Sequence, residues 1–179
     1  MTNSLKNFCN FLILPTFYYI SKKYKNMKSL QTWFEEYSVS HQNMTNKQIH
    51  YICVPVIFFS VVGLFMSFPN EMLAPLASIH PITANWAFIV LVFVLLFYFR
   101  LSFSMGLKML LFAAICLVGN YIVGQFISLL LFSVIVFSVG WIGQFYGHKI
   151  EGKKPSFIKD LQFLLIGPAW VIHSVFANK

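Results

Sequence analysis

Charged residues are scarce in this chain, and acidic residues are the scarcest. Charged side chains make up 10% of the 179 residues and hydrophobic ones 58%, with 13 lysines and arginines against 5 acidic residues. A water-soluble domain of this length cannot bury so large an apolar fraction, so the composition excludes an ordinary soluble protein. The net charge of +8 would suit nucleic acid, but the basic residues lie between apolar segments, which favours a membrane and no nucleic-acid partner.

Cysteine is rare, and the common catalytic motifs are missing. The three cysteines, Cys9, Cys53 and Cys116, form no CxxC pair, so we assign no disulfide. The sequence also has no P-loop, GxSxG, HExxH or GxGxxG motif. Nucleotide chemistry and serine-based chemistry therefore lack support.

Long stretches without any charge indicate membrane-spanning helices. The longest, Met109 to His148, has 40 residues, and at about 1.5 Å per residue it is long enough to cross a core of roughly 30 Å twice. We expect a turn near its middle, at Gly119-Asn120 and Gly124-Gln125. Two further uncharged stretches are Tyr51–Asn70 and Met72–Phe99. The sequence therefore predicts an all-α, polytopic membrane helix bundle with four spans, at about 51–68, 84–99, 105–122 and 126–146.

Basic residues flank these spans on alternate sides. Lysines up to Lys47 precede the first span, and Arg100 and Lys108 lie around the connection of the second to the third. Lys149, Lys153, Lys154 and Lys159 follow the fourth. The connection 69–85 has no lysine or arginine. By the positive-inside rule both termini lie in the cytoplasm. We expect a multi-pass protein of the bacterial inner membrane, or of the endoplasmic reticulum membrane if the chain is eukaryotic.

The first part of the chain divides into an extension and the start of a membrane domain. Residues 1–26 are expected to form an N-terminal extension, either an interfacial anchor or a dispensable segment, ahead of a membrane domain over 27–179. An amphipathic helix is predicted over Ser29–Ser40. Thr45 and Gln48 form a capping-box pair that would begin the next helix.

The last apolar segment, Leu161 to Phe176, contains Gly167-Pro168 near its middle. A glycine and a proline in sequence favour a bend over a fifth crossing. We therefore predict a helix, a bend and a second helix lying at the cytoplasmic interface.

Three histidines, His41, His50 and His148, lie at the ends of different apolar segments, on the side that carries the lysines. Neutral imidazole is a common metal ligand. The pattern predicts a metal site where the bundle meets the cytoplasm. The alternative for any single histidine is a polar residue at the membrane interface.

Polar residues at helical spacing accompany these histidines. Asn46 and His50 share one helix face, and so do Gln144, His148 and Glu151. Asn46, Gln144 and Glu151 are therefore candidates for orienting the metal-bound rings by hydrogen bonds.

Two residues are candidates for additional metal ligands. Glu151 would complete a set of two histidines and one carboxylate, or else remain a solvated carboxylate paired with nearby lysines. His173 would approach the metal if the last segment lies flat against the site.

Two blocks of residues stand out: Tyr37, His41, Asn46, His50 and Val54-Pro55, then Trp141, Gln144, Gly147-His148, Glu151, Pro155 and Gly167-Pro168. These blocks resemble the DUF962, or Mpo1-like, family, over about Met27 to Ile172. Characterised members are Fe(II)-dependent dioxygenases that shorten 2-hydroxy fatty acids by one carbon with release of CO2, a step in phytosphingosine degradation. The resemblance implies Fe(II) as cofactor, a 2-hydroxy fatty acid and O2 as substrates, and His41, His50 and His148 as catalytic iron ligands.

Two other classes of protein compete with the dioxygenase. Three histidines and a water also make a catalytic zinc set, which would give a zinc-dependent membrane lipid hydrolase. A non-enzymatic lipid-binding or transport protein is the third class, although the spans hold no internal charged residue, whereas ion pathways usually do. The sequence does not determine the oligomeric state or the preferred chain length.

Overall fold

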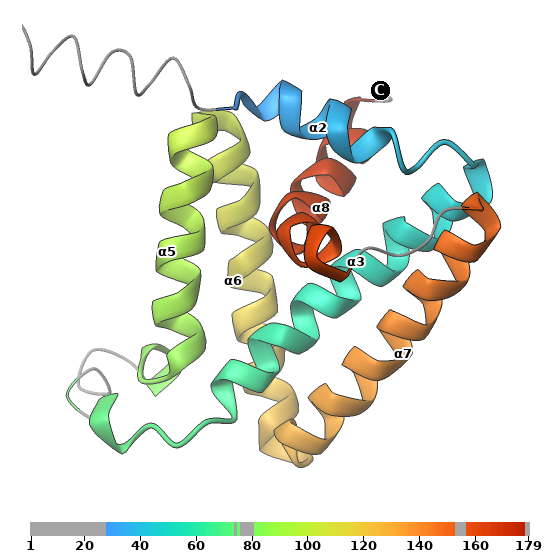
Figure 1. The fold of residues 1–179 in the computed structure, drawn as a ribbon. Coiled ribbons are helices and arrows are strands. Elements are labelled where there is room, and N and C mark those ends of the chain that lie inside the picture. Colours follow the sequence, from blue (N-terminus) through green and yellow to red (C-terminus); the bar gives the residue numbers. More distant parts are fainter. Residues whose placement is uncertain (1–27, 74, 76–80, 153–156, 178–179) are drawn as a thin grey trace, which may run out of the picture.

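The computed structural model describes residues 28–73, 75, 81–152 and 157–177, and the predicted extension 1–26 lies outside them. Within the described residues the structure is helical, without strands, which confirms the all-α class. Figure 1 shows its elements in order: α2 (Leu30–Ser38), α3 (Met44–Met66), η1 (Glu71–Leu73), η2 (Pro81–Thr83), α5 (Trp86–Leu101), α6 (Phe103–Phe126), α7 (Leu129–Glu151) and α8 (Phe157–Ala177).

Three of the described helices are long and apolar enough to cross a membrane: α3, α6 and α7. Their mean hydropathies are 2.2, 1.9 and 1.8. The helix at the second predicted span, α5, is as apolar but has only 16 residues, which is about 24 Å of helix. These helices make the chain a membrane protein.

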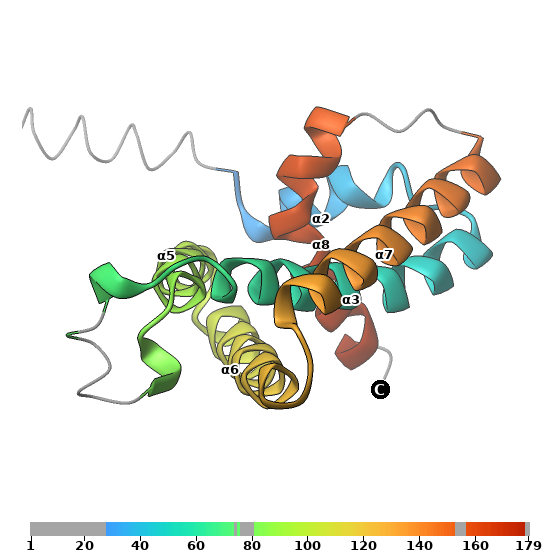
Figure 2. The same cartoon turned by 90° about the horizontal axis from the view of Figure 1, so that it is seen from below.

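The helices form two pairs, with a third layer across them. α3 packs along α7, and α5 packs along α6. α8 crosses α3 and contacts α2, as the two perpendicular views in Figures 1 and 2 show. The first turns of α3 and the last turn of α7 therefore meet at one end of the bundle, next to α2 and α8.

Glycines allow α3 and α7 to approach closely. Gly140, Gly143 and Gly147 recur every three or four residues, so they share one face of α7. A Cβ on them would lie 2.6 Å from Ile57 Cγ1, 2.5 Å from Cys53 Sγ and 2.4 Å from Asn46 Oδ1, respectively. Small residues are the usual means by which membrane helices bring their backbones together.

Two predicted helix boundaries are wrong. α6 continues through Asn120 to Phe126 rather than turning between 119 and 125. The Asn120 side chain is buried and its N–H groups donate to the carbonyls of Phe59 and Cys116, so the donors of this residue, which is typical of turns, are satisfied inside a helix. The cap of α3 is Asn43, whose side-chain oxygen accepts from the backbone N–H groups of Thr45 and Asn46, so Thr45 is not the cap.

The predicted division of the last segment into two helices at Gly167-Pro168 is also wrong, because α8 runs as one helix from Phe157 to Ala177, with Pro168 inside it. Gly167 lies against α3, where a Cβ would come within 3.1 Å of Val54 Cγ1. Pro168 is buried and removes the helical hydrogen bond to the Leu164 carbonyl. Packing against α3 therefore offsets the unfavourable local sequence.

Candidate metal centre

The structure brings His41, His50 and His148 together at this end of the bundle. His41 lies in the loop between α2 and α3, His50 in the second turn of α3, and His148 in the last turn of α7. Their ring centroids are 4.3 Å (His41–His50), 5.1 Å (His50–His148) and 5.6 Å (His41–His148) apart. All three are buried, with exposed fractions of 2%, 1% and 7%.

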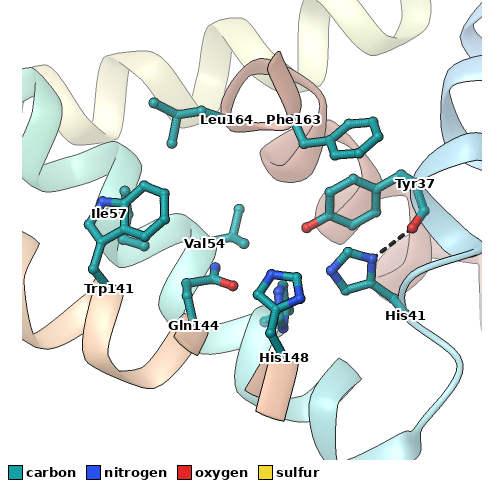
Figure 3. Close-up of a pocket in the computed structure, with 10 residues that line it drawn as sticks. Tyr37, His41, Val54, Ile57, Trp141, Gln144, His148, Phe163 and Leu164 are labelled. Atoms are coloured by element: carbon teal, nitrogen blue, oxygen red, sulfur yellow. Dashed lines mark hydrogen bonds between the residues drawn. The ribbon is translucent and has the colours of Figure 1, made fainter. Parts of the chain in front are cut away.

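Hydrogen bonds fix which nitrogen of two rings carries the proton. His41 Nδ1 lies 2.7 Å from the Tyr37 carbonyl (Figure 3), and His50 Nδ1 lies 2.9 Å from the Asn46 carbonyl. A carbonyl only accepts, so each Nδ1 is the donor and the lone pair of each neutral ring is on Nε2. Orientation of a metal-binding imidazole by a hydrogen bond from its other nitrogen is the usual arrangement in metalloproteins.

The spacing of the donor atoms fits a single metal ion. One nitrogen from each histidine lies within 4.8 Å of the others, and no other group among the described histidines, cysteines and acids comes together in this way. Metal–nitrogen distances of about 2.1 Å place two bound nitrogens up to roughly 4.2 Å apart. Small rotations of the rings would therefore bring all three to bonding distance.

Glu151 attaches the His41 loop to the end of α7. One carboxylate oxygen accepts from the backbone N–H of Gln42 at 2.8 Å, and the other accepts from the N–H of Asn43 and from Asn46 Nδ2, both at 2.9 Å. These bonds engage both oxygens. In this geometry Glu151 positions His41 relative to His148 and is not a member of the ligand cluster.

The remaining predicted residues divide into two groups. Asn46 is fully buried and connects Glu151 to the His50 ring, through its side chain and its carbonyl respectively. Gln144 is buried and faces the same cavity as the histidines. His173 lies elsewhere: it is exposed, and its ring packs against Phe34 with centroids 5.0 Å apart.

A cavity of about 30 Å³ opens beside the histidines. In Figure 3 the Tyr37 hydroxyl points toward it, and the Tyr37 ring stacks on His41 at 4.1 Å with an interplanar angle of 6°. The cavity is lined by Tyr37, His41, His50, Val54, Ile57, Trp141, Gln144, His148, Phe163 and Leu164.

Sequence reasoning missed several members of this site. The sequence places Tyr37 only in a motif block, but its ring lies over His41 and its carbonyl sets the tautomer of that ring. Phe163 and Leu164 were assigned to no site. The i, i+3, i+7 spacing of the α7 glycines was the available signal for a close helix contact at the histidines.

The fold and the cluster define a membrane-embedded helix bundle with a buried three-histidine site at one end. A family model described as 2-hydroxy-palmitic acid dioxygenase Mpo1-like matches residues 27–178, and the chain belongs to this Mpo1-like family. The resemblance carried by the two motif blocks is thereby confirmed. No curated protein and no solved structure matches the chain.

Proposed function

We propose that this protein is an Fe(II)-dependent dioxygenase that converts a 2-hydroxy fatty acid and O2 into the fatty acid one carbon shorter, CO2 and water. The observation that carries the proposal is the cluster of three buried imidazoles, two of them with their lone pairs fixed on Nε2 by backbone hydrogen bonds. The family model named for a 2-hydroxy-palmitic acid dioxygenase supports the same reaction class.

The donor set suits ferrous iron. Three imidazoles from one side, with a small cavity beside them, leave ligand positions open, as Fe(II) oxygenase sites require. When bound here, iron would supply the one-electron chemistry that allows O2 to react with an organic substrate. His41, His50 and His148 would hold it.

The chain's own residues would bind and orient the substrate. A 2-hydroxy acid presents a carboxylate and an adjacent hydroxyl, and the Gln144 side chain and the Tyr37 hydroxyl face the cavity where that head group would lie. The site is buried, so its walls would exclude bulk water during the reaction. The alkyl chain would lie among the helices, because most of the remaining lining is apolar.

The reaction balances without an added reductant. The C1–C2 bond breaks, C1 leaves as CO2, and C2 becomes the new carboxylate. These changes remove four electrons from the substrate, which reduce one O2 completely. We therefore expect one O2 consumed for each acid, with no requirement for a nicotinamide or an oxoacid co-substrate.

We propose four membrane crossings, by α3, α5, α6 and α7, with both termini in the cytoplasm and α2 and α8 at that interface. Arg100, Lys108 and Lys149 lie near the bundle end that carries the histidines, as the positive-inside rule requires for a cytoplasmic site. Trp86 and Arg100 mark the two ends of α5, and both residue types are typical of interfaces. Reporter fusions after residues 66, 101, 126 and 151 would test this topology.

The decisive experiment is O2 uptake by detergent-purified protein loaded with Fe(II), with 2-hydroxypalmitate as substrate. The expected result is one O2 consumed and one CO2 and one pentadecanoate formed per acid, and no turnover under argon. Lipid hydrolysis that continues without O2 and requires zinc would support the hydrolase instead. A folded protein that binds neither iron nor zinc would support the non-enzymatic lipid-binding protein.

A further inference from the structure

A second cavity adjoins the one at the histidines. It measures about 180 Å³ and lies among α3, α5 and α8. Leu164 lines both cavities, and in Figure 3 it lies at the edge of the histidine cavity on the side away from His148 and His41. The second cavity is lined by Phe58, Val61, Val62, Phe65, Ala87, Val90, Leu91, Val94, Leu164 and Leu165, which we call the acyl groove.

Helix α3 connects the two cavities along its length. Val54 and Ile57 line the histidine cavity. Phe58, one helical turn after Val54, begins the wall of the acyl groove, which continues to Phe65. Phe65 of α3 and Val90 of α5 line both the acyl groove and a further pocket beyond it, so they mark the far end of the groove. The histidine cavity and the acyl groove therefore lie one after the other along α3, with Leu164 between them.

The lining of the acyl groove selects an apolar ligand. Every side chain that lines it is a hydrocarbon, so nothing in it would compensate a ligand for the loss of hydrogen bonds to water. Hydrophobic cavities of roughly 150 Å³ remain dry and bind small apolar molecules. A stretch of alkyl chain is a ligand of this kind.

The length of the path fits a long chain. Fifteen residues of α3 separate His50 from Phe65, a distance of about 22 Å along the helix. The acyl chain of one membrane leaflet extends through half of the hydrocarbon core, about 15 Å. A chain whose head lies at the histidines would therefore fill the acyl groove if it is long, and a short chain would end near Leu164.

We propose that the acyl groove holds the hydrocarbon chain of the 2-hydroxy acid and sets its length preference, with Leu164 as the side chain that the alkyl tail must pass. The proposal rests on the proposed function for the identity of the head group. Pro168 supports the assignment of Leu164, because it cannot donate to the Leu164 carbonyl and so leaves that turn of α8 with one restraint fewer.

Photolabelling tests where the chain lies. A 2-hydroxy fatty acid of sixteen carbons with a diazirine at its terminal carbon is expected to label peptides containing Phe65, Ala87 or Val90. Unlabelled 2-hydroxypalmitate should suppress this labelling. Labels that fall only on lipid-facing residues, without competition, would overturn the proposal. The protein is used without added iron, so the result does not depend on turnover.

Chain-length profiles test whether the acyl groove sets specificity. Ala87 is almost fully buried in the far wall, so Ala87→Phe should lower kcat/KM for 2-hydroxypalmitate by about tenfold or more and leave 2-hydroxyoctanoate unchanged. Phe65→Ala opens the same end and should shift the preference toward chains longer than sixteen carbons. The second variant removes atoms, so it keeps the test informative if the first fails to fold.

Ala114→Phe is the matched control, because Ala114 is exposed on α6 and lines neither cavity. Its profile should equal that of the unchanged protein. Identical chain-length profiles for all variants would contradict the role of the acyl groove in specificity, but they would not contradict the proposed dioxygenase activity. No turnover of any 2-hydroxy acid by the unchanged protein would instead contradict the proposed function, while photolabelling would still report on the groove.

Discussion

The two ends of the α3–α7 pair both bury polar side chains, but they use them differently. At the histidine end, ring N–H groups donate to backbone carbonyls and leave nitrogen lone pairs beside a shared cavity. At the opposite end, which we call the amide end, Asn120 uses its N–H groups to bind the carbonyls of Phe59 and Cys116. The histidine end therefore presents nitrogen acceptors to a ligand, whereas the Asn120 amide at the other end links α6 to α3 by a hydrogen bond.

Close helix approach is common to both ends, so it does not by itself indicate a site. A Cβ on Gly147 would lie 2.4 Å from Asn46 Oδ1, and one on Gly63 would lie 2.2 Å from Ser133 Oγ and 2.3 Å from Asn120 Oδ1. Glycine thus makes room for buried polar groups in both places. What distinguishes the histidine end is the chemistry of the side chains that converge there.

Replacing the imidazoles is the strongest test of this difference. Alanine at His41, His50 or His148 removes one nitrogen ligand. We expect each variant to lose Fe(II) affinity and O2 uptake by more than about a hundredfold, since loss of a mere supporting partner already costs roughly 10–100-fold. Bound iron per purified protein, together with O2 uptake, is the measurement.

His173→Ala is the control for these variants, because that ring is exposed and packs on Phe34 outside the cluster. It should keep its iron and its activity. A full complement of iron in any of the three cluster variants would remove that histidine from the ligand set, and loss of iron in His173→Ala would add His173 to it.

Gly147→Ala should cause the next largest effect. The new methyl group would meet Asn46 Oδ1 at 2.4 Å and His50 Cε1 at 3.3 Å, so α7 or the His50 ring must shift. We expect iron affinity to fall by about 10–100-fold, as for other disturbed ligand supports. The control is Gly124→Ala, whose Cβ would make only ordinary contacts at 3.7 Å. Equal iron affinity in both variants would show that close packing at Gly147 does not support the site.

Glu151→Gln tests whether this residue positions the His41 loop or binds the metal. A glutamine has one accepting oxygen, so it cannot satisfy the N–H groups of Gln42, Asn43 and Asn46 as the carboxylate does. A positioning role predicts a loss of iron affinity of about tenfold. A loss as large as that of the histidine variants would instead identify Glu151 as a ligand. The exposed Glu36, changed to Gln, should leave iron binding unaltered.

The sequence predicted the parts of the molecule that depend on composition and spacing. Uncharged stretches located the long helices, and i, i+4 spacing placed Asn46 with His50 and Gln144 with His148. The convergence of His41 with the others was predicted from charge placement. In the structure, the hydrogen bonds of Glu151 hold the His41 loop at the end of α7, and they join residues more than 100 positions apart in the chain.

The errors occurred where tertiary contacts override local preference. The Asn120 amide donates to a carbonyl on α3, and the predicted turn is a helix. Gly167 packs on α3, and the two helices predicted on either side of Gly167-Pro168 are one helix. In both cases the deciding partner lies far away in the chain, where local patterns carry no information.

The amide end provides the smallest expected effect and the other half of the comparison. Asn120→Leu removes the hydrogen bond to the Phe59 carbonyl, and such bonds between membrane helices contribute about 0.6 kcal/mol on average and at most roughly 1.7. For a chain of this size about 0.6 kcal/mol lowers the unfolding midpoint by about 1–2 °C, and iron content should be unchanged. Gln125→Leu, an exposed amide on the same helix, controls for the change in polarity. If Asn120→Leu instead lowered iron content as Gly147→Ala should, the two ends would be energetically coupled through α3. Helix packing at the amide end would then contribute to metal binding.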